Sequence, residues 1–304
     1  MKNSSQRGVA LVMVLLIVAM ATTIAAFMAQ QQGFWQREME NGRDRAQARR
    51  IAEAGIDWAR AVLADDASIS QSDNAKEMWA MQLPAIPVEG GEVLGYIIDQ
   101  QGLFNLNNLV DNNGVASELD LKRFQNLLSA LNLPQELGAA LADWEDANSE
   151  TMDNGAEDEY YMNLPQPYRC ANRPLSDIGE LAGVKGFDAT IIKRLQPFVS
   201  VLPESNTAVN VNFAPPEVLR AILGLPLETA RQIATDIKTM PVKDMDDFFK
   251  RFTSVKRDST MNLSVSSQYF MVTGYATQGD GASAAHALLH RTGTWATQVR
   301  KSLQ

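Results

Sequence analysis

The feature that most constrains this chain is an uncharged apolar run from Val9 to Met28. Its twenty residues are enough to cross a hydrocarbon layer of about 30 Å as a helix. The apolar core of a cleaved secretory signal is shorter, at roughly 7 to 15 residues. We therefore predict a transmembrane helix over residues 9–28.

The residues after the apolar run favour continuation of the same helix. Residues 29–64 are mostly helix formers and contain no proline. A helix from Val9 to Leu63 would be about 80 Å long at 1.5 Å per residue. The sequence therefore predicts a stalk that carries the rest of the chain away from the membrane.

Charges around the span give its expected orientation. Lys2 and Arg7 precede it, and the positive-inside rule assigns that side to the cytoplasm. The arginines between residues 43 and 50 weaken this assignment, because they lie beyond the span.

Composition limits the possible structure and partners of the chain beyond the stalk. The 304 residues, 45% of them hydrophobic, suffice for more than one packed unit. A net charge of −9 disfavours a general nucleic-acid-binding surface, since Lys and Arg bind phosphate backbones. The single cysteine, Cys170, has no partner for a disulfide within the chain, and we interpret it as a small buried apolar residue.

Hydrophobic patterning predicts a sheet interrupted by helices. The polar residues 65–77 should end the stalk helix and lie on the surface. Two short strands are expected around Gly90 and Gly91, and helical spacing begins near residue 104. Strand patterns return near residue 269 and flank a QGDG turn. This predicts a C-terminal hairpin whose partner is the early strand.

The densest acidic segment, ADWEDANSETMDNGAEDEYY, partly matches the calcium loop of an EF-hand. Asp146, Asn148, Glu150 and Glu157 fall at positions 1, 3, 5 and 12 of that loop. Position 6 should be glycine and is Thr151. The match is therefore partial.

A short loop rich in carboxylates can still bind a hard cation without an EF-hand backbone. Nearby aromatic residues indicate an ordered, partly buried loop, in which a cation would relieve the repulsion between carboxylates. The alternative is a solvated acidic loop. The candidate calcium ligands are Asp143, Asp146, Asn148, Glu157 and Asp158.

Two further patterns are interpreted as structural. Segments ELAGVKGFDATIIKRL and ILGLPLETARQIATDIK resemble helix-hairpin-helix units, which can present a turn to DNA. Few basic residues lie near the turns, and only Arg231 is within reach of the second, so packing is the favoured interpretation. His286 and His290 are four residues apart in a strand-like region, where they would be about 13 Å apart, too far for one metal ion.

The basic leader, glycine, apolar helix and stalk together resemble a class III prepilin signal, the substrate of prepilin peptidase. The resemblance implies cleavage after Gly8, with Val9 as the new, methylated amino terminus. That family normally has glutamate at the fifth mature position, where this chain has Met13.

Lack of this glutamate resembles the minor pseudopilin K family of the type II secretion system. The segments YIIDQQGLFNLNNL, YRCANRPLSDIGEL and NVNFAPPEVL look like landmarks of the same family. The resemblance implies an α+β pseudopilin fold with a long N-terminal transmembrane and stalk helix, a small antiparallel sheet and a large inserted helical domain. In some members this insertion carries Ca²⁺, which supports the acidic loop as a structural calcium site.

The implied function is that of a non-enzymatic tip subunit of the secretion pseudopilus, assembled with minor pseudopilins I and J. The tip would contact exported cargo or the outer-membrane channel, and no nucleic acid. The implied location is the inner membrane of a Gram-negative bacterium, single-pass, with the C-terminal domain in the periplasm. Two alternatives are a membrane-anchored helix-hairpin-helix DNA-binding protein of an uptake system and an anchored periplasmic hydrolase that uses the acidic loop.

The expected organisation has seven parts. They are the leader (1–8), the transmembrane helix (9–28), the stalk (29–64), the first part of the core (65–102), the inserted helical domain with the acidic loop (103–204), a second helical unit (205–262) and the returning C-terminal strands (263–304).

Overall fold

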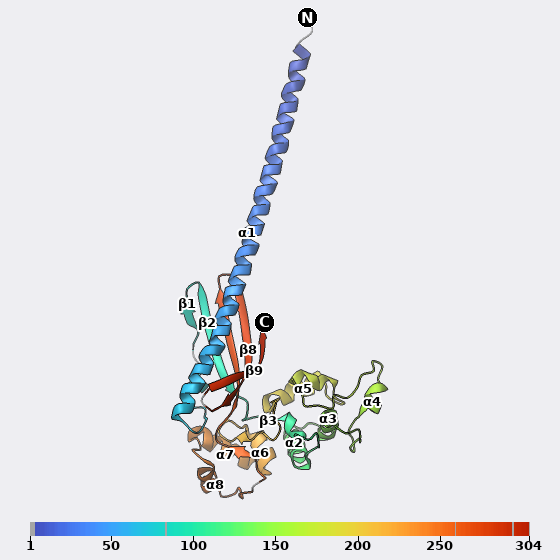
Figure 1. Ribbon diagram of the computed structural model, residues 1–304, viewed down its shortest axis with the longest axis vertical. Coiled ribbons are helices and arrows are strands. Elements are labelled where there is room, and N and C mark those ends of the chain that lie inside the picture. The colour runs from blue at the N-terminus through green and yellow to red at the C-terminus, as the bar shows by residue number, and fades with distance from the viewer. Residues whose placement is uncertain (1–3, 83, 259, 294, 304) are drawn as a thin grey trace.

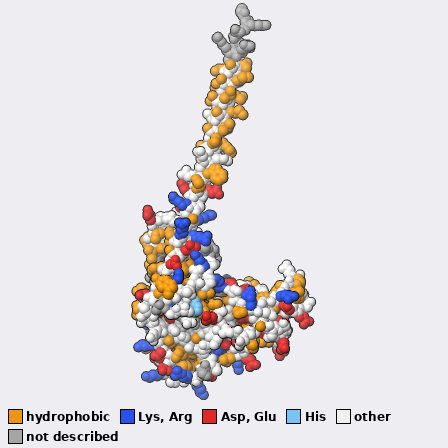
Figure 2. Space-filling view, in the orientation of Figure 1, with side chains coloured by type: hydrophobic (Ala, Val, Ile, Leu, Met, Phe, Trp, Pro, Cys, Tyr) orange, Lys and Arg blue, Asp and Glu red, His pale blue; other side chains and the backbone are white. Residues whose placement is uncertain are grey.

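A computed structural model describes residues 4–82, 84–258, 260–293 and 295–303. Its longest element is α1 (Ser4–Ile69), a single helix of 66 residues. The N-terminal half of α1 projects alone from the rest of the molecule (Figure 1). Hydrophobic side chains cover this projecting part (Figure 2), and the helix is long and apolar enough to cross a membrane.

The sheet has five antiparallel strands in the order β1-β2-β7-β8-β9. They are β1 (Ile86–Val88), β2 (Gly91–Asp99), β7 (Tyr269–Gln278), β8 (Gly281–Thr292) and β9 (Trp295–Leu303). The predicted pairing of the early strand with the C-terminal hairpin is confirmed, because β2 pairs with β7. The segment after the QGDG turn forms two strands, since the chain reverses at Gly293, whose φ is 77°.

Helix α1 packs on one face of this sheet. The contact is close at Gly274, where an added Cβ would lie 2.4 Å from the carbonyl oxygen of Ala52. Ile56 and Leu63 of α1 are buried against Phe270 and Leu289 of the sheet. Burial of such side chains stabilises a fold by roughly 1.5 to 3 kcal/mol each, so the C-terminal half of α1 belongs to the core.

Residues 100–268 form a mainly helical region between β2 and β7, here called the inserted region. Its α-helices are α2 (Glu118–Ala130), α3 (Leu137–Glu145), α4 (Asp158–Met162), α5 (Ala189–Leu195), α6 (Pro216–Leu223), α7 (Leu227–Thr239) and α8 (Met245–Arg251). Short 3-10 helices are η2 (Leu106–Leu109), η3 (Ile178–Gly183) and η4 (Gln196–Phe198), and η1 (Met78–Ala80) precedes β1. Two short parallel pairs join β3 (Phe104–Asn105) to β4 (Val199–Ser200), and β5 (Val209–Asn210) to β6 (Leu263–Ser264).

The inserted region has its own large core, to which Phe104, Phe124 and Trp144 contribute. Both helix-hairpin-helix-like segments bury apolar side chains in this core, including Leu181 and Ile233. Arg231, the basic side chain expected near the second turn, forms an ion pair with Glu228. These contacts favour the packing interpretation of the two segments.

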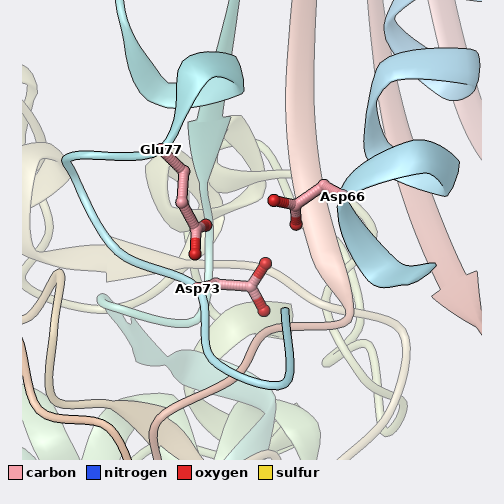
Figure 3. A group of neighbouring side chains, drawn as sticks. All are labelled: Asp66, Asp73 and Glu77. Atoms are coloured by element: carbon pink, nitrogen blue, oxygen red, sulfur yellow. The ribbon is translucent and has the colours of Figure 1, made fainter. Parts of the chain in front are cut away.

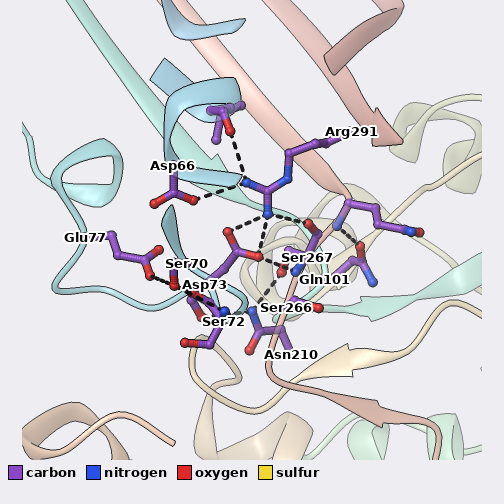
Figure 4. A network of polar contacts seen from close by, with 12 residues as sticks. Asp66, Ser70, Ser72, Asp73, Glu77, Gln101, Asn210, Ser266, Ser267 and Arg291 are labelled. Carbon is purple, nitrogen blue, oxygen red and sulfur yellow. Dashed lines mark hydrogen bonds and ion pairs between the residues drawn. The ribbon is translucent and has the colours of Figure 1, made fainter. Parts of the chain in front are cut away.

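The polar residues 65–77 contain the end of α1, at Ile69, and lie mostly at the surface, as their composition predicts. Asp73 is the exception, because it is only 1% exposed. The cause is Arg291 of β8, which donates to the carbonyl oxygen of Leu63 and pairs with Asp66 and Asp73 (Figure 4). These contacts hold the last turns of the helix and the following loop against the sheet.

Candidate functional site: two acidic clusters

Among the residues that the structure describes, two groups of three carboxylates have oxygens within 4.8 Å of one another. The first, here called the stalk cluster, consists of Asp66, Asp73 and Glu77. The second, here called the loop cluster, consists of Asp143, Asp146 and Glu157. The two differ in the groups that lie against their oxygens.

The stalk cluster forms where the end of α1 meets the loop that leads to η1 (Figure 3). Nη2 of Arg291 lies 2.6 Å from both carboxylate oxygens of Asp73, and Nη1 lies 3.2 Å from Oδ2 of Asp66. Asp73 also accepts the backbone N–H of Ser267 at 2.7 Å. The guanidinium group therefore occupies the position in which a cation would neutralise the two aspartates.

Glu77 completes the stalk cluster through neutral donors. It accepts hydrogen bonds from Asn74, Ser70 and the indole N–H of Trp79. Burial still raises the pKa of Glu77, and burial together with Asp73 raises the pKa of Asp66.

Asp99 lies at the end of β2 and is buried close to this cluster. Its Oδ2 accepts the backbone N–H of Gly102, while Oδ1 has no hydrogen-bond partner among the described residues. Burial raises its pKa to about 7, and Ser267 and Gly102 only partly offset that shift. Asp99 therefore holds a proton more readily than an exposed aspartate.

The loop cluster is built at the end of α3. Asp143 lies in the last turn of this helix, and Asp146, three residues further on, is its C-cap. Glu157 precedes α4 in an extended conformation, and the intervening loop brings it back beside the helix end. All three residues are buried.

Carboxylate oxygens of the loop cluster lack partners. Oδ2 of Asp146 and both carboxylate oxygens of Glu157 are buried without a hydrogen bond in the described part of the chain. None of the ion pairs formed by the described residues includes a member of this cluster. Lys185 is nearby, but its ammonium group donates to the carbonyl oxygen of Gly155 at 2.8 Å.

This environment shifts the titration of all three acids upward. Burial raises the pKa of Asp143, and it also raises that of Asp146. For Glu157, burial and then the charges of Asp146 and Asp143 raise the pKa to about 7. A buried carboxylate group of this kind favours either protons or a cation.

Gly155 keeps the loop close to Asp143. A Cβ on Gly155 would lie 1.9 Å from Oδ2 of Asp143, so any larger residue would displace the carboxylate or the loop. The backbone N–H of Met152 donates to the same carboxylate at 3.1 Å. Calcium-loop spacing does not reveal this role of Gly155, although the Asn-Gly pair at 154–155 is a turn signal.

Not all predicted ligands meet in the structure. Asp143, Asp146 and Glu157 come together, whereas Oδ1 of Asp158 accepts the backbone N–H of Cys170 at 2.8 Å. The side-chain oxygen of Asn148 accepts the N–H of Glu150, while the backbone N–H of Asn148 donates to Oδ1 of Asp146 at 3.2 Å, so Asn148 lies beside the cluster. The arrangement thus differs from EF-hand spacing, because an ending helix sets the positions of the aspartates.

Cys170 borders this site. It is partly buried and packs against the core of the inserted region, close to its interpretation as a small buried apolar residue, and its Sγ lies 3.3 Å from the carbonyl oxygen of Asp143. Burial, followed by the charge of Glu157, raises the pKa of the thiol to about 12. The side chain is therefore a neutral thiol beside the acidic cluster.

The oxygen-only donor set of the loop cluster fits a hard divalent cation. Ca²⁺ takes six to eight oxygen ligands in flexible geometry, so carboxylates, carbonyl oxygens and water can share one ion. The unpartnered buried oxygens are consistent with such a ligand, since buried polar groups are ordinarily satisfied. The stalk cluster fits an ion less well, because Arg291 already contacts two of its members.

The expected processing site lies at the start of α1. Gly8 and Val9 are both helical, and Val9 and Met13 are exposed along the projecting part of the helix. Residues 1–3 of the expected leader lie outside the described residues.

Comparison with known proteins identifies relatives over most of the chain. A family model described as type II secretion system (T2SS), protein K, matches residues 102–204, within the inserted region. Proteins named type II secretion system protein K are 33% identical in Pseudomonas aeruginosa, 32% in Klebsiella pneumoniae and 31% in Pectobacterium carotovorum. These matches cover 94%, 96% and 96% of this chain and 89%, 94% and 94% of the respective relatives.

A solved structure shares the fold. It is the crystal structure of the GspK-GspI-GspJ complex from the type 2 secretion system of enterotoxigenic Escherichia coli. The matched chain superposes with a TM-score of 0.72 at 22% identity, over 91% of this chain and 99% of that one. Identity above 30% over nearly the whole length places the chain in the type II secretion system protein K family, the minor pseudopilin family that its opening and landmark segments resemble.

Proposed function

We propose that this chain is the tip subunit of a type II secretion pseudopilus. In this role it is a structural, non-enzymatic component, anchored in the inner membrane by α1 with its folded part in the periplasm. The observation that carries the tip position is Met13, which stands where the prepilin family normally has glutamate.

The physical argument concerns burial of charge. In an assembling fibre, the glutamate of one subunit is thought to neutralise the amino terminus of the subunit ahead of it. A carboxylate without such a partner is costly to bury among apolar helices or in lipid. In a subunit with no neighbour ahead, an apolar side chain at this position avoids that cost, and Met13 provides one.

Substitution of Met13 tests the position. In the proposed role, Met13→Glu gives no gain in secretion and impairs assembly, because the new carboxylate lacks a partner. Met20→Glu, about two turns further along the same exposed helix, measures the general cost of a carboxylate in the span. Improved secretion by Met13→Glu would instead indicate a position inside the fibre.

The proposed partners are minor pseudopilins I and J. Support comes from the solved structure of the same fold, whose chain was crystallised in a complex with GspI and GspJ. Cross-linking in membranes followed by mass spectrometry should recover the corresponding two proteins. The same spectra should identify Val9 as the mature, methylated amino terminus, and an intact Met1 in cells with active prepilin peptidase would contradict the assignment.

We further propose that the loop cluster binds a structural Ca²⁺. The carrying observation is the set of buried, unpartnered oxygens on Asp146 and Glu157, with Asp143 completing the group. Binding to the folded state alone would stabilise it by about 2.7 kcal/mol when the ion is at one hundred times its dissociation constant. Mg²⁺ should stabilise less, because it requires stricter octahedral geometry.

Thermal unfolding of the full chain in detergent tests the ion site. Chelator should lower the melting temperature by several degrees, and Ca²⁺ should restore it more fully than Mg²⁺. The double variant Asp146→Ala, Glu157→Ala should lose this response. The control pair Glu150→Ala, Asp153→Ala removes two acids from the same loop but leaves the cluster intact, and should keep the response. An unchanged melting curve of the wild-type protein in chelator would contradict a bound Ca²⁺ at the loop cluster.

A further inference from the structure

A cleft of about 630 Å³ separates the sheet from the inserted region. It lies on the sheet face opposite α1, because side chains alternate along β2 and Ile97 is buried on the α1 side. Tyr96 and Ile98 of β2 therefore point the other way and line this cleft, together with Met271 and Leu288. A small cluster of Leu202, Tyr269 and Leu288 packs beside the cleft.

The opposite wall includes β4, a strand of two residues that are only 3% and 4% exposed. β4 pairs with β3 on one side, and no second strand pairs with it among the described residues. Beyond that ladder, the main-chain groups of Ser200 and Val201 form no hydrogen bond in the described part of the chain. Val199, Ser200 and Val201 all line the cleft. Unpaired strand edges are templates for pairing with another extended segment.

The hydroxyl of Ser200 is a second polar group at this wall that lacks a hydrogen-bond partner among the described residues. Ser200 is only 4% exposed. Buried hydroxyls are ordinarily hydrogen-bonded. This hydroxyl therefore provides a donor and an acceptor beside the unpaired main chain of β4.

The charges and apolar surface of the cleft limit its ligand. Arg300 and Asp177 lie 3.6 Å apart and both line the cleft, so their charges offset one another. Asp99 also lines the cleft, but its side chain is buried, and burial raises its pKa and so favours the neutral carboxyl. Ile98 is 47% exposed although it is a large apolar side chain. A cleft with balanced charge and exposed apolar surface fits an uncharged ligand with apolar side chains.

From these features we infer that the cleft binds an extended, uncharged polypeptide segment of a partner protein. The segment pairs its main chain with the free edge of β4 and with the Ser200 hydroxyl. Its alternate side chains are apolar and pack on Tyr96, Ile98 and Met271. Main-chain pairing supplies affinity in such strand addition, and contacts to alternate side chains supply specificity.

A fluorescein-labelled, capped heptapeptide of alternating valine and serine is the probe, titrated against the full chain in detergent and followed by fluorescence anisotropy. Binding should saturate, and deuterium exchange at Ser200 and Val201 should slow. A peptide with proline at its centre should bind at least several-fold more weakly, because proline removes an N–H donor.

Two variants locate the binding. Ile98→Asp should weaken affinity roughly tenfold or more, since it places a charge against apolar ligand side chains. Val115→Asp, at a 59% exposed apolar position outside the cleft, is the matched control and should leave affinity unchanged. Ser200→Ala should weaken affinity several-fold while the protein keeps its unfolding midpoint, because the lost hydroxyl has no internal partner among the described residues.

Three results would overturn the inference. They are absence of saturable binding, equal binding of the proline peptide, and equal affinity of Ile98→Asp and wild type. Sedimentation of the full chain provides a further check. A dimer that Ile98→Asp dissociates would assign the cleft to a second copy of this chain instead of a partner protein.

Discussion

The stalk cluster and the loop cluster present nearly the same three carboxylates in opposite chemical states. At the stalk cluster, Arg291 reaches across from β8 and pairs with Asp66 and Asp73. At the loop cluster, the nearby ammonium group of Lys185 donates to a backbone carbonyl oxygen, and oxygens of Asp146 and Glu157 have no partner among the described residues. Proximity of carboxylates therefore does not define a metal site. The deciding factor is whether the fold itself supplies the positive charge.

The difference also assigns different roles. The stalk cluster joins α1, the loop before η1 and the sheet, and Asp73 extends these contacts to the inserted region through Asn210 (Figure 4). The side chain of Asn212 donates to the same carbonyl oxygen of Asp73. Arg291 supplies the positive charge of this joint. The loop cluster holds the end of α3 and the start of α4 in a region whose order we propose to depend on an ion.

Removal of Arg291, whose guanidinium group pairs with Asp66 and Asp73, should have the largest effect on stability. Arg291→Met leaves Asp73 buried without its counter-charge, and loss of one partner of a buried pair costs about 3 to 5 kcal/mol. Urea unfolding of the full chain measures this loss. Arg257→Met, which breaks the exposed pair with Asp246, should cost less than about 1 kcal/mol. Equal losses for the two variants would show that Arg291 does not hold the joint.

The next effect concerns pH at the same joint. Asp99 has its pKa raised to about 7 by burial, so the folded state holds a proton that the unfolded state has released between about pH 4 and pH 7. Stability should therefore fall as pH rises through this window, by up to about 4 kcal/mol. An asparagine side chain cannot ionise, so Asp99→Asn should remove the loss of stability that Asp99 causes. Urea unfolding at pH 4, 5.5 and 7 gives the free energy of unfolding of both proteins. The same dependence on pH in the variant and the wild type would contradict this role of Asp99.

A smaller change should disturb the loop cluster alone. In Gly155→Ala, the new Cβ meets Oδ2 of Asp143, and overpacking of this kind costs about 1 to 3 kcal/mol. The variant should also bind Ca²⁺ more weakly, while the pairs of Arg291 with Asp66 and Asp73 stay intact. Calorimetric titration measures the affinity, and Gly42→Ala is the control, because Gly42 lies in α1 and an added Cβ there has nothing within 4 Å. Unchanged calcium affinity in Gly155→Ala would place the ion elsewhere.

The sequence predicts the features that short-range patterns determine. The apolar run before Arg37 predicts the projecting half of α1, and the strand patterns around Gly90 and residue 269 predict the sheet. The acidic segment points to the loop cluster because Asp143, Asp146 and Glu157 lie within fifteen residues of one another.

Long-range contacts escape such patterns. Asp73 and Arg291 are 218 residues apart, and nothing in the polar composition of residues 65–77 distinguishes a buried joint from a surface loop. Likewise, EF-hand spacing cannot reveal that Asp158 turns to the backbone of Cys170 while Gly155 makes room for Asp143. Those features depend on which backbone groups the folded chain brings alongside each carboxylate.

Anomalous diffraction from crystals grown with Ca²⁺ tests the contrast between the clusters most directly. We predict a calcium peak among the carboxylates of Asp143, Asp146 and Glu157. We predict no peak among Asp66, Asp73 and Glu77, where the Arg291 guanidinium should appear instead. A peak at the stalk cluster, or none at the loop cluster with calcium in excess, would contradict the claim that the internal arginine is what separates the two sites.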